Sequence, residues 1–142
     1  MDFKLIIDKE HKEEVIVYAK AETQLVNSIK ELVLSETQLV AFKGDEIIKI
    51  SPNDVYCFTI EKNKLYAVME NEKLQIKKRL YQLEESLGNT FVKINQSSIA
   101  NIKKIDRFSV SIGGALMVKF KNGYRDFVSR RQVKFVKERM GI

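Results

Sequence analysis

The chain has 142 residues, enough for one well-cored domain with or without a small attachment, and its 44% of hydrophobic residues is typical of a globular protein. No apolar run approaches the roughly 20 residues that a transmembrane helix requires, and the N-terminus lacks the features of a secretory signal. We therefore expect a cytoplasmic protein. The single histidine, His11, and the single cysteine, Cys57, are far apart in the sequence, which argues against a transition-metal site.

Positive charge is concentrated in the second half of the chain. Residues 1–61 carry 7 Lys/Arg against 12 Asp/Glu, whereas residues 62–142 carry 18 against 7. Such an uneven distribution is typical of a nucleic-acid-binding surface, because cations that neutralise phosphates release condensed counterions. A basic face that only keeps the protein in solution is the alternative.

Residues 1–37 look like a β-α extension. Two short β-branched runs, at residues 3–7 and 14–19, predict strands separated by a polar turn. Residues 22–34 predict an amphipathic helix. Its apolar face consists of Leu25, Val26, Ile29, Leu32 and Val33. This face either forms a homodimer or covers the protein's own sheet.

From residue 38 onward the pattern is mostly β, which predicts a mainly β (α+β) fold for residues 38–142. Strands are expected at residues 38–42, 46–50, 54–59, 64–69, 91–94, 101–112, 115–121 and 124–129. Residues 75–88 predict a helix that includes Ile76 on its apolar face and ends at Gly88. The pairs Gly113-Gly114 and Asn122-Gly123 predict tight hairpins with primed turns. A short helix or turn is expected at the C-terminus, and Cys57 is expected to be buried in an apolar strand.

The sequence lacks the motifs of common enzymes. It has no phosphate-binding loop, no nucleophile elbow and no spaced cluster of His and Cys. Its adjacent acids occur in turn-like or helix-surface sequence, where solvated charge is the simplest explanation. We therefore expect neither catalysis nor a cofactor.

Three polar or cationic segments remain as candidate contacts for a partner. Residues 95–98, "NQSS", lie between apolar anchors, and Asn and Gln can pair with an adenine edge. Residues 61–64, "EKNK", form the tip between two expected strands. Residues 128–141 contain five cations at a boundary between strand-like and helix-like sequence. Each segment alone also fits an ordinary polar turn or a solvated face.

Taken in order, these segments resemble the LytTR family of bacterial DNA-binding domains over residues 38–141. The resemblance depends on "FVKINQSSIANIKKI" followed by "NG" and "VSRR". It implies an antiparallel LytTR-type β fold with one or two short helices. Members of this family present loops, in place of a recognition helix, to successive major grooves of bent DNA.

The resemblance also implies which residues contact DNA. Base contacts are expected from the loop of residues 62–64, from Asn95 and Gln96, and from Arg131 at the end of the strand that begins at Tyr124. Lys93 replaces the usual arginine and Asn95 the common histidine, so the family's base preference does not carry over. The full set of expected contacts is Lys62, Asn63, Lys64, Lys93, Asn95, Gln96, Ser97, Arg130, Arg131 and Lys134.

The expected partner is double-stranded DNA with paired direct repeats, which two linked protomers would occupy with avidity. Only about 37 residues precede the match, too few for a receiver domain. Stand-alone relatives often accompany a small membrane protein that restrains them. Two alternatives stay open. One is a module that binds an acidic protein, and the other is an RNA binder, which the core-like alternation of the aromatic residues disfavours.

Overall fold

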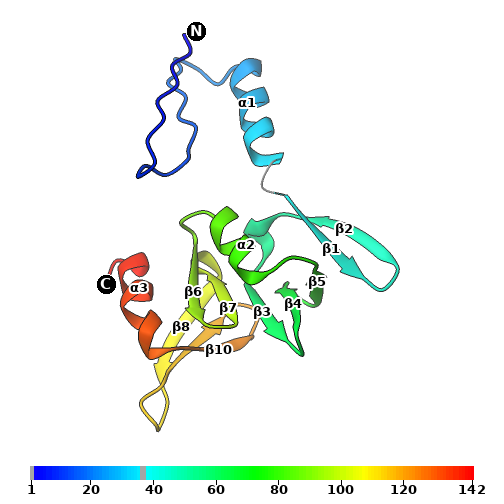
Figure 1. The fold of residues 1–142 in the computed structure, drawn as a ribbon, viewed down its shortest axis with the longest axis vertical. Helices are drawn as coiled ribbons and strands as arrows, with labels where there is room; N and C mark the ends of the chain where they lie inside the picture. The colour runs from blue at the N-terminus through cyan, green and yellow to red at the C-terminus, as the bar shows by residue number, and fades with distance from the viewer. Residues whose placement is uncertain (1, 36–37) are drawn as a thin grey trace. The chain divides into compact units, whose positions relative to one another are not determined.

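The computed structural model describes residues 2–35 and 38–142. The chain divides into two compact units, residues 1–36 and residues 37–142, and Figure 1 shows the ribbon of each. Within the described ranges, no helix is both long enough and apolar enough to cross a membrane.

The first unit contains one helix, α1 (Gln24–Ser35). Thr23 caps its start, since its hydroxyl accepts a hydrogen bond from the Val26 amide at 3.3 Å. The two strands predicted at residues 3–7 and 14–19 are not formed, so that prediction is wrong. A lone two-stranded ribbon is marginally stable in water, and the apolar side chains of both runs, such as Ile7 at 84% exposure, are not buried within the unit.

The second unit is built on two antiparallel sheets. The larger sheet has the strand order β2-β1-β5-β4-β3-β7-β6 and the smaller has the order β10-β9-β8. The larger comprises β1 (Leu39–Lys43), β2 (Glu46–Ile50), β3 (Cys57–Glu61), β4 (Lys64–Val68), β5 (Lys73–Ile76), β6 (Phe91–Asn95) and β7 (Ser98–Asn101). The smaller comprises β8 (Ile105–Val110), β9 (Leu116–Phe120) and β10 (Arg125–Val128). Two α-helices, α2 (Leu80–Ser86) and α3 (Arg130–Met140), complete the unit, with short 3-10 turns at Pro52–Asp54 and Ile102–Lys104. The predicted mainly β class is confirmed.

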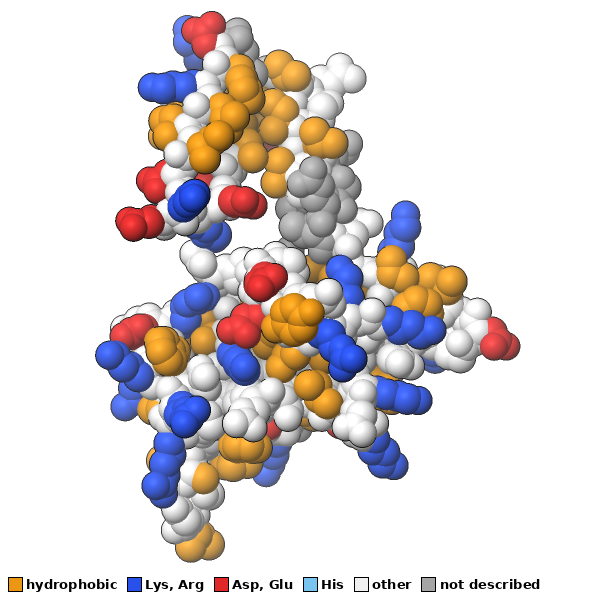
Figure 2. Space-filling view, in the orientation of Figure 1, with side chains coloured by type: hydrophobic (Ala, Val, Ile, Leu, Met, Phe, Trp, Pro, Cys, Tyr) orange, Lys and Arg blue, Asp and Glu red, His pale blue; other side chains and the backbone are white. Residues whose placement is uncertain are grey.

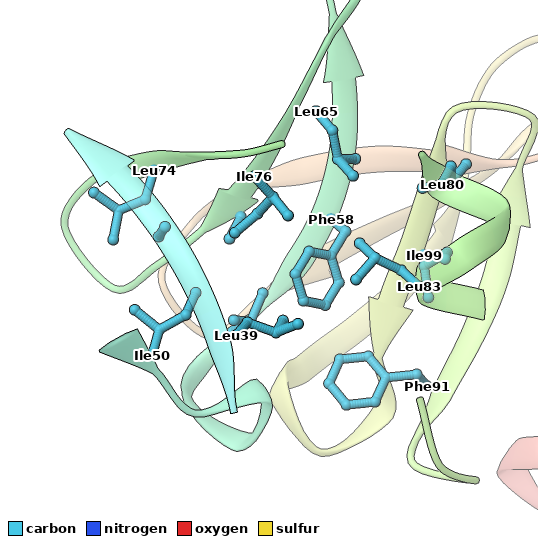
Figure 3. Close-up of a cluster of buried hydrophobic side chains, with 13 residues drawn as sticks. Leu39, Ile50, Phe58, Leu65, Leu74, Ile76, Leu80, Leu83, Phe91 and Ile99 are labelled. Carbon is cyan, nitrogen blue, oxygen red and sulfur yellow. The ribbon is translucent and has the colours of Figure 1, made fainter. Parts of the chain in front are cut away.

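Alternating side chains give the larger sheet two buried faces. Phe58 and Ile99 point into one apolar cluster, which α2 covers with Leu83 (Figure 3). Their chain neighbours Cys57 and Ala100 point into the other cluster, beneath the smaller sheet and α3. This period of two follows from the pleat of a strand. The second unit is therefore layered, with the larger sheet between α2 on one side and the smaller sheet with α3 on the other.

Cys57 is fully buried, as predicted. Burial raises the pKa of its thiol well above the ordinary value, because the charged thiolate would lose its water. At neutral pH this residue therefore behaves as a small apolar side chain.

Tertiary pairing overrides the helical periodicity predicted for residues 75–88. Ile76 lies in β5 opposite Leu65 and is buried there. The helix begins only at Leu80, where the Gln82 side chain accepts a hydrogen bond from the Arg79 amide at 2.9 Å. Two strands, β5 and β7, lie where the sequence predicted none.

Hairpins form at Gly113-Gly114 and Asn122-Gly123, but the prediction that their turns are of the primed type is wrong. Gly114 (φ +80°) and Gly123 (φ +90°) are each the only residue of their loop with positive φ, a pattern typical of three-residue hairpin loops. The loop between β3 and β4 has positive φ at both of its residues, Lys62 (+50°) and Asn63 (+64°). The cationic β3–β4 turn therefore has the type I′ signature, with positive φ at both central residues.

Candidate nucleic-acid interface

The first candidate segment is the β3–β4 turn, residues 61–64. Glu61 and Lys64 pair directly, so Lys62 and Asn63 form a two-residue tip. Lys62, Asn63 and Lys64 are all exposed. The acid at the base of the hairpin, Glu61, is neutralised by Lys73, whose Nζ lies 2.5 Å from its Oε1. The tip consequently presents two amines and one amide to solvent.

The second segment is the β6–β7 turn, where Asn95 pairs with Ser98 and encloses Gln96 and Ser97. Gln96 is exposed. Asn95 is 3% exposed, and its amide nitrogen donates to Asp126 Oδ1 at 3.0 Å and to the Phe127 carbonyl at 2.9 Å. Its amide oxygen accepts from the Ser97 backbone N–H at 2.8 Å. The Asn95 side chain is thus engaged within the protein, and Gln96 is the residue of this turn that faces solvent.

The third segment is the junction between β10 and α3. Arg130 and Arg131 were predicted to end the strand that contains Arg125, but that strand ends at Val128. Both arginines instead occupy the first turn of α3, whose N-cap is Ser129, and both are exposed. The prediction was wrong because the helix begins directly after the cap residue, and arginine is a good helix former.

The electrostatics of this junction are unusual for a helix start. The first turn of α3 has no acidic residue, and Arg130, Arg131 and Lys134 lie within its first two turns. Cations at a helix N-terminus oppose the helix dipole at a cost of about 0.3 to 1 kcal/mol each. The same arrangement adds their charge to a helix end that already attracts anions.

Hydrogen bonds join the three segments along one edge of the second unit. The Ile60 amide donates to the Ser97 carbonyl at 2.9 Å, which holds the β3–β4 hairpin beside the β6–β7 turn. The Ser129 amide donates to the Ile94 carbonyl at 2.8 Å, which holds that turn beside α3. In Figure 1, β3 and β6 point to the lower edge of this unit, and β10 runs along the same edge to the start of α3. Blue Lys and Arg side chains project around this border in Figure 2.

Lys93 is not brought to this edge. It lies within β6, its side chain is 31% exposed, and its Nζ is 4.0 Å from Glu84 Oε2 on α2. Together with Arg139 it lines a surface cavity of about 310 Å³ between α2 and α3. The Arg139 guanidinium is held there by the carbonyls of Asn89 and Phe91.

A second basic feature lies on the smaller sheet and was not singled out from the sequence. Lys119 is directly opposite both Arg107 and Arg125, so three cations cross the sheet side by side. Asp106 pairs with Arg107 at 2.8 Å. Phe127 shares this face and is 49% exposed. The sequence signal was an alternation of cations with buried residues in three successive strands.

The core-like alternation of the aromatic residues holds only in part. Phe91 and Phe120 are buried as expected, whereas Tyr81, Phe127 and Phe135 are exposed. These three belong to α2, β10 and α3, so they do not form one stacking platform on a single strand pair.

Sequence reasoning also missed the half-buried carboxylate behind the edge. Asp126, on β10, accepts hydrogen bonds from Asn95, from Ser98 Oγ at 2.7 Å and from the Tyr124 hydroxyl at 3.4 Å. Burial raises the pKa of the Tyr124 phenol, so its hydroxyl stays protonated and can donate. The sequence pattern that could have predicted this position is the spacing of two residues between Asp126 and the apolar Val128, because side chains two residues apart on a strand lie on the same face.

The described residues hold no group of three His, Cys, Asp or Glu side chains that could bind a metal ion. The chemistry of the edge is instead that of amides, amines and guanidinium groups. Such groups donate hydrogen bonds to phosphate oxygens and to the acceptor atoms of base edges.

Comparison with known proteins points to one family. Residues 45–141 match the model of the LytTr DNA-binding domain. Two proteins called uncharacterized HTH-type transcriptional regulators, from Staphylococcus aureus strains NCTC 8325 / PS 47 and COL, are similar to this chain. Each is 32% identical to it over 118 residues, which cover 83% of this chain and 80% of the relative. A solved LytTr DNA-binding domain of a putative methyl-accepting/DNA response regulator from Bacillus cereus shares the fold, with a TM-score of 0.69 at 20% identity over 75% of this chain and 98% of that one.

Proposed function

Because this chain belongs to the LytTR family of DNA-binding domains, we propose that it regulates transcription by reading double-stranded DNA through the three segments of one edge. The observation that carries this proposal is the alignment of the β3–β4 turn, the β6–β7 turn and the start of α3, joined by the Ile60–Ser97 and Ser129–Ile94 hydrogen bonds. We name this group of residues, 62–64, 96–97 and 130–134, the reading edge. A regulator of this kind acts in the cytoplasm, where bacterial DNA is found.

The exposed side chains divide into two roles. Asn63, Gln96 and Arg131 have the amide and guanidinium groups that discriminate base edges, Arg131 toward guanine and the amides toward adenine. Lys62, Lys64 and Lys134 have compact ammonium groups that bind phosphates without a strict geometry, and we assign Arg130 to a phosphate as well. Asn95 supports Gln96 from behind, since its amide is already engaged within the protein.

Lys93 has a smaller part in this proposal than the family resemblance implied. Its amine lies near Glu84, and a partly neutralised cation attracts phosphate less strongly. Paired direct repeats and a homodimer complete the proposal, because two linked protomers would occupy two sites with avidity.

Selection of bound duplexes from a random pool, followed by a salt titration, tests the proposal. We expect one enriched sequence, which the protein binds at least about a thousandfold more tightly than a shuffled duplex. The logarithm of the affinity should fall linearly with the logarithm of the salt concentration, with a slope that reports the number of phosphates neutralised.

Other outcomes identify the alternative functions. Equal affinity for all duplexes, with tighter binding to single-stranded RNA, would favour an RNA binder that uses Phe127 for stacking. Weak binding to every nucleic acid, even at low salt, would favour a module for acidic proteins. Either result would contradict the proposed function.

A further inference from the structure

Asp126 is an acid placed directly behind a cationic edge. It is half-buried on β10, and among the described residues no Lys or Arg nitrogen lies within 4.0 Å of its carboxylate. Its two oxygens are instead satisfied by hydrogen bonds. Oδ1 accepts from Asn95 Nδ2 at 3.0 Å and from the Phe127 amide at 2.8 Å, and Oδ2 accepts from Ser98 Oγ at 2.7 Å.

The charge of Asp126 is unfavourable for binding a polyanion. Phosphates lie within a Debye length, about 10 Å at 0.1 M salt, of any group just behind a DNA-binding edge. A carboxylate there repels them. Any contribution of Asp126 to DNA binding must therefore come from the side chains that its hydrogen bonds hold in place.

Asp126 connects all three parts of the reading edge, two of them through hydrogen bonds and the third through the chain. Asn95 and Ser98 flank the turn that carries Gln96. Ser98 Oγ lies 2.9 Å from Thr59 Oγ1, which extends the network to β3 and the strand that leads to the β3–β4 tip. Asp126 itself is four residues before Arg130. One carboxylate thus fixes the spacing between segments that come from distant parts of the sequence.

Base discrimination depends on this spacing more than phosphate binding does. A bidentate contact to a base edge requires its donor to lie within a fraction of an ångström of its place, whereas a flexible cation can follow a phosphate. We infer that Asp126 is a positioning residue for sequence discrimination, which sets the β6–β7 turn against the start of α3 without touching DNA. This inference rests on the proposed function.

The chemistry of the network provides a conservative variant. In Asp126→Asn, Oδ1 can still accept from Asn95 and Phe127, and the new amide nitrogen faces the Ser98 and Tyr124 hydroxyls, which can both turn to accept from it. Because either hydroxyl of the Thr59–Ser98 pair can be the donor, the Ser98 hydroxyl can turn toward Thr59 and accept from the introduced amide. The Asp126→Asn variant would keep the spacing and lose the charge, whereas Asp126→Ala loses both.

The test measures the affinity for the wild-type protein's selected duplex and for a shuffled duplex at one salt concentration. The proteins compared are wild type, Asp126→Ala, Asp126→Asn and Asp106→Asn, which removes an exposed acid outside the network. We expect Asp126→Ala to reduce the ratio of the two affinities at least about tenfold, the size of a lost base contact. Both asparagine variants should keep the wild-type ratio within about twofold while binding the shuffled duplex more tightly.

Two results would overturn the inference alone: an unchanged ratio in Asp126→Ala, or an equal loss of ratio in Asp126→Asn. No preference in the wild-type protein would overturn the proposed function and this inference with it. If Asp126→Ala does not fold, Ser98→Ala removes a single arm of the network and should lower the ratio in the same direction. An unchanged ratio in a folded Ser98→Ala would then count against the inference.

Discussion

Lys62 has a backbone conformation that costs energy for a lysine. Its φ of +50° lies in the left-handed region, where a residue with a Cβ is disfavoured by about 1 to 2 kcal/mol. Asn or Gly would be the ordinary choice at the first position of such a turn. A residue type that disfavours the backbone conformation it occupies is often found at a functional site. The function we propose for Lys62 is to bind a DNA phosphate with its amine at the tip of the hairpin.

Replacing Lys62 with asparagine should therefore separate stability from binding. The free energy of unfolding should rise by about 1 kcal/mol, because Asn tolerates this conformation better than Lys. The DNA affinity should fall equally for selected and shuffled duplexes, with a salt slope smaller by about 1. Urea denaturation and binding titrations measure the two effects.

Lys49→Asn is the matched control, since it removes the same charge from the outermost strand, β2, far along the sheet from the reading edge. It should leave the salt slope unchanged. A salt slope that falls equally in both variants would show that only the net charge of the protein matters, and would contradict a phosphate contact at the tip.

Individual residues also show where sequence reasoning succeeds and fails. Gln96 and Asn95 are adjacent amides in one polar turn, and nothing in the local sequence distinguishes the exposed one from the buried one. The distinction arises from Asp126, 31 residues later, whose carboxylate holds Asn95 inward. Partners so distant in sequence leave no local pattern.

Helix α1 presents more apolar surface than its own unit buries. Leu25 is 52% exposed, and Val26, Ile29 and Val33 are half-buried. The apolar spacing of this helix was predicted correctly from periodicity, because period 3.6 is a local property of the sequence. We propose that this face forms the homodimer contact.

Light scattering at tens of micromolar tests the dimer. The wild-type protein should have twice the chain mass of 16.5 kDa. Leu25→Glu should shift it to the monomer, because a charge buried in an apolar contact must lose its water. Asn27→Glu places the same charge at an exposed polar position of the same helix and should leave the dimer intact. A wild-type protein that is monomeric throughout, or equal behaviour of both variants, would contradict this contact.

The order of helices and strands also bears on how DNA is read. Five strands separate α1 from α2, and five more separate α2 from α3, so the described residues contain no pair of consecutive helices. A helix-turn-helix would require such a pair.

The strands β5 and β7 were not predicted from periodicity. Both are short and lie between two other strands of the larger sheet, and a short apolar run does not distinguish a strand from a helix.

The two units differ in how far the sequence predicts them. The β-rich second unit was predicted in class and in most strands, because alternation and turn residues are local signals. What could not be predicted was the juxtaposition of the three segments, since it depends on pairing across the sheets. The family resemblance supplied that arrangement as an expectation, and the Ile60–Ser97 and Ser129–Ile94 hydrogen bonds give it a physical basis.

Duplex selection with variants of each segment tests the reading edge most directly. Asn63→Ala, Gln96→Ala and Arg131→Ala should each relax the preference at a different position, in the order of the segments along the edge, at a cost of about 1 to 3 kcal/mol each. Lys134→Ala should weaken binding to selected and shuffled duplexes alike. If the three variants keep the wild-type preference, or lose affinity equally on both duplexes as Lys134→Ala does, these segments do not read the sequence of DNA.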